Sequence, residues 1–142
     1  MEKLYRIEKD FLGEKRIELN KYYGIQTLRA KENFNITKTD ISLFPNFIKS
    51  LAKVKKACAL TNFELGDLTD IQKDAIVQAC NEIIDGKFHD QFIVDPIQGG
   101  AGTSTNMNAN EVIANRALEI LGHPKSSYDI IHPNNHINMS QS

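Results

Sequence analysis

Apolar residues recur every three or four positions in three segments of this 142-residue chain. This spacing is the period of one α-helical face, so it predicts three amphipathic helices that each bury one stripe. Because strands would need a period of two, the pattern favours a mainly α fold. The three stripes are Phe47, Leu51, Val54 and Cys58; Ile71, Ala75, Ala79 and Ile83; and Val112, Ile113, Ala117, Leu118 and Leu121.

Individual residues in the sequence also predict where the helices begin and end. Pro45 suits the first turn of a helix, where its missing N–H matters little. Gly66 ends that helix, and Thr69 followed by Gln72 is a capping box that starts the next one. The third helix is expected from near Thr105 to Gly122.

The N-terminal region shows a weaker pattern. Residues 4–19 alternate weakly between apolar and polar side chains on both sides of Gly13, which indicates a short β-hairpin. A short helix is expected within residues 22–34. The fold class is therefore mainly α with a short N-terminal hairpin. The apolar residues expected to share one face of the hairpin are Tyr5, Ile7, Ile17 and Leu19.

Composition excludes several classes of protein. A net charge of −1 gives no support for a nucleic-acid surface, which needs a clustered positive field. No apolar run approaches the roughly 20 residues of a membrane span. Residues 1–10 are charged and carry no signal-peptide core, so a cytoplasmic location is expected. One group of lysines is interpreted as a solvated helix face, with an anion-binding patch as the alternative: Lys49, Lys53, Lys55 and Lys56.

A glycine-rich stretch stands directly before the third helix. Residues 98–105 read Gln-Gly-Gly-Ala-Gly-Thr-Ser-Thr. Such a loop lets the backbone approach a ligand closely, and the free N–H groups at the start of a helix attract a carboxylate or phosphate. No lysine follows the glycines, so the stretch is not a Walker A loop. A flexible loop whose Ser or Thr caps the helix is the alternative.

Polar residues follow on the third helix and beyond it. Asn106 and Asn110 are four residues apart and share a helix face, where they either orient a small polar ligand or bond to neighbouring helices. His132 and His136 have the spacing of two metal ligands on a helix. Pro133 argues against a helix there, and no Cys or carboxylate cluster joins the two histidines. Neither a metal site nor a cofactor is expected.

Taken together, these segments resemble the aspartase and class II fumarase family. Leu28 and Ala101 are more typical of the aspartase branch. The resemblance implies an all-helical protein in which residues 1–141 form the N-terminal helical domain, and in which Ser142 begins a central helical bundle that is truncated here. It also implies a homotetramer with active sites assembled from several chains. The matching stretches are residues 22–30, 32–34, 90–92, 98–104, 106–112, 132–134 and 138–142.

The resemblance also implies a reaction and a substrate site. The reaction is the reversible elimination of ammonia from L-aspartate, a small dicarboxylate, to give fumarate. Thr103 corresponds to a substrate-binding hydroxyl on a loop that includes Ala101, Gly102 and Ser104. Ser142 opens the Ser-Thr-Asn triplet that grips the substrate. The family's base belongs to a later loop, so none of these 142 residues is assigned as catalytic, and this part alone is expected to be inactive.

A second, outer dicarboxylate site is implied at His132, Asn134 and Asn135, although Asn135 stands where an Asp is usual. Two other functions stay open. One is a class II fumarase, which adds water to fumarate to give malate. The other is a non-catalytic helical module that binds a partner. Neither nucleic acid nor a membrane is an expected partner.

Overall fold

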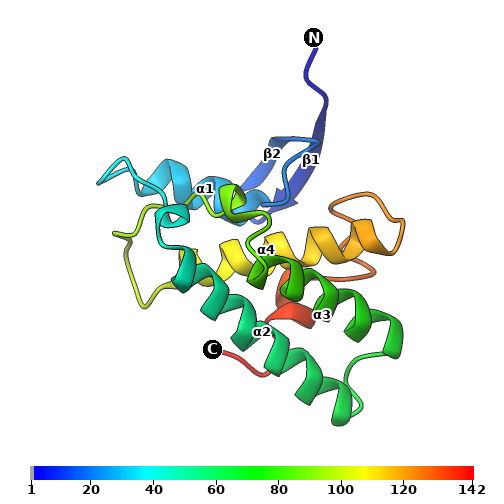
Figure 1. Cartoon of the computed structure of the whole chain (residues 1–142). Helices are drawn as coiled ribbons and strands as arrows, with labels where there is room; N and C mark the ends of the chain where they lie inside the picture. The colour runs from blue at the N-terminus through cyan, green and yellow to red at the C-terminus, as the bar shows by residue number, and fades with distance from the viewer. Residues whose placement is uncertain (1) are drawn as a thin grey trace.

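The structure, a computed structural model, describes residues 2–142 and is mainly helical, as Figure 1 shows. A small antiparallel hairpin at the N-terminus precedes the helices, so the predicted fold class is confirmed. The elements in chain order are β1 (Tyr5–Asp10), β2 (Gly13–Glu18), α1 (Ile25–Asn33), the 3₁₀ turn η1 (Ile41–Leu43), α2 (Pro45–Glu64), α3 (Asp70–Ile84), the 3₁₀ turn η2 (His89–Gln91), α4 (Thr103–Ile120) and the π-helical turn η3 (Pro133–Ile137).

The expected helix boundaries agree closely with the structure. Pro45 occupies the first position of α2. The Gln72 N–H donates to Thr69 Oγ1 at 3.1 Å, and the Thr69 N–H donates to Gln72 Oε1 at 3.1 Å, so the capping box forms as predicted. Helix α4 begins at Thr103, two residues earlier than expected, and this difference places the hydroxyls of the glycine-rich stretch on the helix itself.

The hairpin forms, but its predicted apolar face is wrong. Arg6 pairs with Ile17 across the two strands, so Ile17 lies on the same face as Arg6 and Glu8. That face is buried. Arg6 Nη2 donates to the Tyr23 carbonyl at 2.8 Å and to Glu8 Oε2 at 3.3 Å, so a bonded polar pair occupies the place expected for apolar residues. The exposed apolar residues are Tyr5, Ile7 and Leu19.

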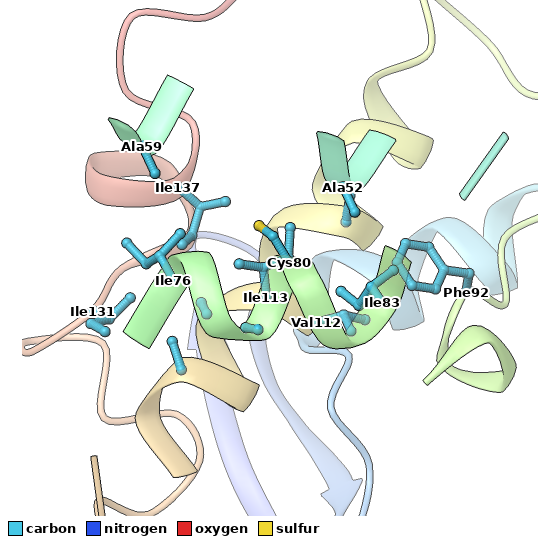
Figure 2. Close-up of a cluster of buried hydrophobic side chains, with 14 of the residues drawn as sticks. Ala52, Ala59, Ile76, Cys80, Ile83, Phe92, Val112, Ile113, Ile131 and Ile137 are labelled. Atoms are coloured by element: carbon cyan, nitrogen blue, oxygen red, sulfur yellow. The ribbon is translucent and has the colours of Figure 1, made fainter. Parts of the chain in front are cut away.

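The core forms where α3 packs between α2 and α4, as the close-up in Figure 2 shows. The stripe predicted for α4 is confirmed from Val112 to Leu118, and in α3 the stripe is buried from Ala75 to Ile83, although Ile71 is exposed. The side chains labelled in Figure 2 come from α2 (Ala52, Ala59), α3 (Ile76, Cys80, Ile83), α4 (Val112, Ile113) and the connecting segments (Phe92, Ile131, Ile137).

The stripe predicted for α2 is not the face that it buries. Phe47 is 46% exposed and Val54 is 56% exposed. The buried face lies one residue further along, at Ile48, Ala52 and Ala59, where small side chains let α3 approach closely. Helix α2 thus has two apolar faces, and a periodic pattern alone does not tell which one meets the core. In the part of the chain described here, no helix is both long and apolar enough to cross a membrane.

Candidate functional site

The glycine-rich loop turns sharply into α4 because two of its glycines adopt left-handed backbone conformations. Gly100 has a φ of 81° and Gly102 a φ of 86°. Residues with a Cβ rarely adopt this region, so both turns depend on glycine. The N-cap of α4 is Gly102, which has no side chain that could accept a hydrogen bond from the first turn of the helix. The alternative of a helix capped by Ser or Thr is therefore wrong.

Only some of the backbone N–H groups in the first turn of α4 have a hydrogen-bond acceptor. Gln98 Oε1 accepts the Thr105 N–H at 3.0 Å, and Gln98 Nε2 donates to Thr105 Oγ1 at 2.8 Å. Within residues 2–142 no acceptor reaches the N–H groups of Thr103 and Ser104. Thr103 is also exposed. Free N–H groups, a helix dipole and a hydroxyl at one point make a binding place for a carboxylate.

A cavity of about 490 Å³ adjoins this loop. The loop residues Gly100, Ala101 and Gly102 line one side of it, and Phe47 and Leu51 of α2 line another. The face of α2 that borders the loop therefore lies beside its core face, and Leu51 also packs against the core. Thr103 and Ser104 do not line this cavity, so the predicted substrate residues divide between the cavity wall and the helix end.

Lys55 corrects the view that all the neighbouring lysines form a solvated face. It is only 3% exposed. Its Nζ donates to Asn106 Oδ1 at 2.5 Å, to Gln141 Oε1 at 2.8 Å and to Asn138 Oδ1 at 3.2 Å. Burial lowers the pKa of Lys55 to about 8. Its position continues the buried period of α2, between Ala52 and Ala59, and this was the signal that could have found it.

The asparagines of α4 join the helix to other segments. Asn106 also donates from Nδ2 to Asn138 Oδ1 at 3.0 Å. Asn108 is fully buried and binds the backbone of residues 91–93 through both its oxygen and its nitrogen. Asn110 is buried too, and within residues 2–142 its Oδ1 has no donor. For Asn106 the bonds between helices support the structural interpretation.

Ser142 lies at the exposed end of the segment that follows η3. Hydrogen bonds fix this segment in two ways. The Gln141 N–H donates to the Asn138 carbonyl at 3.0 Å, and the side chains of Asn138 and Gln141 both accept from Lys55. Thr103 and Ser142 come from distant parts of the sequence. Each is close in sequence to a partner of Lys55, namely Asn106 and Gln141, so one cluster connects the two segments that carry them.

His132 caps a π-helical turn, which corrects the expectation that Pro133 excludes a helix there. Its Nδ1 accepts the N–H groups of Asn134 at 3.0 Å and Asn135 at 3.3 Å. His136 Nδ1 accepts the His132 N–H at 2.7 Å. Burial lowers the pKa of both histidines. With these bonds made, one ring nitrogen of each histidine is already occupied by the backbone.

A second cavity, of about 530 Å³, contains part of the predicted outer site. His132 and Asn134 line it together with Glu111 and Tyr128. Asn135 stands in the same turn but does not line the cavity. The turn thus brings two of the three predicted residues to one hollow.

Glu111 was not singled out from the sequence, although it interrupts the apolar stripe of α4. Its Oε1 accepts the N–H and the hydroxyl of Thr27 at 2.7 and 2.6 Å, and its Oε2 accepts the Gln26 N–H at 3.1 Å. Burial raises the pKa of Glu111 to about 7, and the nearby Glu8 carboxylate acts in the same direction. Gly24 is required here, because a Cβ at that position would lie 2.2 Å from Glu111 Oε2.

Comparisons with known proteins cover almost all of the chain. A model of the Lyase family matches residues 13–142. The aspartate ammonia-lyase of Bacillus subtilis (strain 168) is 63% identical over 141 residues, which are 99% of this chain and 29% of that protein. The aspartate ammonia-lyase of Helicobacter pylori (strain J99) is 61% identical over 137 residues, which are 96% of this chain and 29% of that protein.

Solved structures of related lyases also match almost the whole chain. The native form of a fumarate lyase:delta crystallin from Brucella melitensis is 55% identical, with a TM-score of 0.95, over 98% of this chain and 32% of that one. The class II fumarase from Schistosoma mansoni is 40% identical, with a TM-score of 0.89, over 98% of this chain and 29% of that one. The chain spans less than a third of the length of these relatives.

Proposed function

This chain belongs to the Lyase family, and from that premise we propose that it is the N-terminal part of an aspartate ammonia-lyase. The complete protein reversibly eliminates ammonia from L-aspartate to give fumarate. Support comes from the curated relatives of that name, which are 61–63% identical to nearly the whole chain. Within the complete protein, residues 1–141 form the N-terminal domain, and Ser142 begins the central helical bundle.

One observation carries the proposal at the level of residues. Thr103 and Ser104 offer N–H groups without an acceptor in residues 2–142, while Gln98 already satisfies Thr105 one position later. Elimination needs removal of a proton next to a carboxylate, which builds negative charge on that carboxylate. Fixed donors aimed at developing charge are the most effective stabilisers of such a transition state. Thr103 is the hydroxyl donor in this role, and Ala101 and Gly102 shape the loop around the substrate.

The second gripping group is Ser142, on the segment tied to α4 through Lys55. We assign no catalytic base within these residues, because the family resemblance places it on a later loop. The 142-residue chain alone is therefore expected to bind a dicarboxylate weakly and to release no fumarate from aspartate.

The cavity at His132 is proposed as a second dicarboxylate site. Asn134 lines this cavity, and Asn135 belongs to the same turn. The carboxylate of Glu111 in the same wall opposes a dianion while it is charged. Binding there is accordingly expected to strengthen below the pKa of Glu111, which is about 7.

The class II fumarase alternative has weaker support. Identity to the aspartate ammonia-lyases is 61–63%, against 40% to the fumarase from Schistosoma mansoni, which favours ammonia over water as the leaving group. A coupled assay of the complete protein with aspartate and with malate distinguishes the two reactions. A non-catalytic binding module would turn over neither. We further propose a cytoplasmic homotetramer that requires no cofactor.

Thr103→Ala in the complete protein tests the assignment. Loss of one donor to the developing charge is expected to lower kcat by a factor of about a hundred to a thousand, with little change in melting temperature. Thr103→Ser keeps the hydroxyl and is expected to stay within about tenfold of the parent protein. Thr61→Ala, at another exposed helical threonine, is the matched control. A Thr103→Ala enzyme with unchanged kcat would reduce Thr103 to a residue of the helix end.

A further inference from the structure

The buried ammonium group of Lys55 joins the two segments that carry the proposed substrate ligands. We propose that Lys55 is a positioning residue of the substrate site, which sets the spacing between the first turn of α4 and the segment that ends at Ser142. This inference rests on the proposed function, because it concerns the geometry of that same site. Lys55 does not itself contact the substrate in this role.

The geometry of the cluster is complete for an ammonium group. A protonated lysine has three donors, and Lys55 uses all of them on amide oxygens of Asn106, Asn138 and Gln141. Those acceptors belong to α4 and to the C-terminal segment, while Lys55 belongs to α2. One charged group therefore fixes three parts of the chain that are distant in sequence. Figure 1 shows the C-terminal segment running beside α2.

The cluster orients the amides as well as holding them. Asn106 Oδ1 points to Lys55, so its Nδ2 is turned to Asn138 Oδ1 at 3.0 Å. Gln141 Oε1 also points to Lys55, so its Nε2 donates to the backbone carbonyl of residue 137 at 2.9 Å. Without the ammonium group, three oxygens would face one another, and the Asn106–Asn138 hydrogen bond would be the part of this cluster that still joins the segment before Ser142 to α4.

Lys55 is an unfavourable choice if the only need is stability. It forms no ion pair within residues 2–142, and a buried charge held by neutral amides is commonly less stable than well-packed apolar side chains of similar volume. An apolar residue at this position would continue the face of Ile48, Ala52 and Ala59. A charge retained at a stability cost is typical of a functional site.

The consequence for catalysis is geometric. Thr103 stands three residues before Asn106 on the same helix, and Ser142 directly follows Gln141. A displacement of about 1 Å between substrate-holding groups lowers turnover by about a hundredfold. Loss of the cluster is therefore expected to affect turnover far more than loss of any other lysine on α2.

The test uses the complete protein with Lys55→Met, Lys55→Arg and the control Lys53→Met, which removes an exposed lysine from the same helix. Fumarate absorbance is expected to show a loss of kcat/KM of about a hundredfold for Lys55→Met, with most of the loss in kcat. Partial recovery, to within about tenfold, is expected for Lys55→Arg, because the guanidinium keeps several donors. Lys53→Met is expected to match the parent protein.

A second readout does not depend on turnover. Amide hydrogen exchange at Gln141 and Ser142 is expected to be at least about tenfold faster in Lys55→Met than in Lys53→Met, because local opening becomes easier. Gln141→Met removes one acceptor from the other side of the contact. It is expected to reproduce both effects in part, which keeps the test decisive if Lys55→Met does not fold.

Different results would overturn the proposed function and the proposed role of Lys55. A parent protein that releases no fumarate from aspartate overturns the proposed function, while hydrogen exchange still decides whether Lys55 sets the spacing. An active parent protein with equally active Lys55→Met, or with unchanged exchange at Gln141 and Ser142, overturns the role of Lys55. Equal loss of activity in Lys53→Met would show a general charge effect and would overturn it as well.

Discussion

Replacing Glu111 by Gln is expected to change how the stability of the 142-residue chain depends on pH. Glu111 is 1% exposed, and burial raises its pKa from 4.5 to about 7. Below pH 4.5 the carboxyl is protonated in both the folded and the unfolded chain. Between pH 4.5 and 7 the folded chain binds more protons, so the free energy of unfolding contributed by this group falls as pH rises. The contribution is lost once the pH exceeds the folded pKa.

The magnitude follows from the size of the shift. One pKa unit corresponds to about 1.4 kcal/mol, so a shift of about 2.5 units, from 4.5 to about 7, corresponds to about 3 kcal/mol. Glutamine cannot titrate. The free energy of unfolding of the parent chain should therefore fall by about 3 kcal/mol relative to that of Glu111→Gln between pH 4.5 and pH 8.

Urea unfolding followed by circular dichroism at half-unit steps of pH measures this difference. Burial lowers the pKa values of His132 and His136, so these groups contribute stability that rises with pH. They are present in both proteins, and their effect largely cancels in the difference. Glu64→Gln, at an exposed glutamate, controls for the loss of one negative charge. Parallel curves for the parent chain and Glu111→Gln, separated by a constant amount, would refute the reasoning.

Two further outcomes follow from the packing. Gly24→Ala should lower the free energy of unfolding by about 3 kcal/mol in urea titrations. The added Cβ would clash with Glu111 Oε2, so the carboxylate would lose its hydrogen bonds to residues 26 and 27. An unchanged unfolding midpoint would mean that the start of α1 adapts without cost. The 142-residue chain should self-associate in light scattering, because Phe47 and Val54 leave an apolar face of α2 open. The double variant Phe47→Ser and Val54→Ser should restore a monomer, and a parent chain that is monomeric at every concentration would contradict this.

The sequence predicted the helices well because their signals are local. The capping box at Thr69 and Gln72 and the glycines at the start of α4 act within a few residues of their own position. Those local rules also supported a binding place for an anion at Thr103. The hairpin was predicted from the weak alternation on both sides of Gly13, which is also a local pattern.

What the sequence left undecided depends on contacts between distant segments. Helix α2 carries two apolar faces, and only the position of α3 determines that Ile48 rather than Phe47 is buried. In β1 the buried face is polar, because Arg6 finds acceptors that lie more than ten residues away. Patterns of hydrophobicity treat charged residues as exposed, so they cannot report a charge that has found buried partners.

Two of the buried charged groups missed in this way lie at the two candidate sites. Lys55 links the first turn of α4 to the segment of Ser142, and Glu111 lines the cavity of His132. Lys55 lies on a helix face that buries Ile48 and Ala52, where an apolar residue would be the more stable choice. Glu111 lies on a helix face that buries Leu118 together with asparagines. A buried charge of this kind is more readily explained by a role in a binding site than by the stability of the fold, since Lys55 positions two segments and Glu111 repels a bound dianion. A lysine or glutamate in register with a buried helical stripe is therefore the sequence feature that would have pointed to both sites.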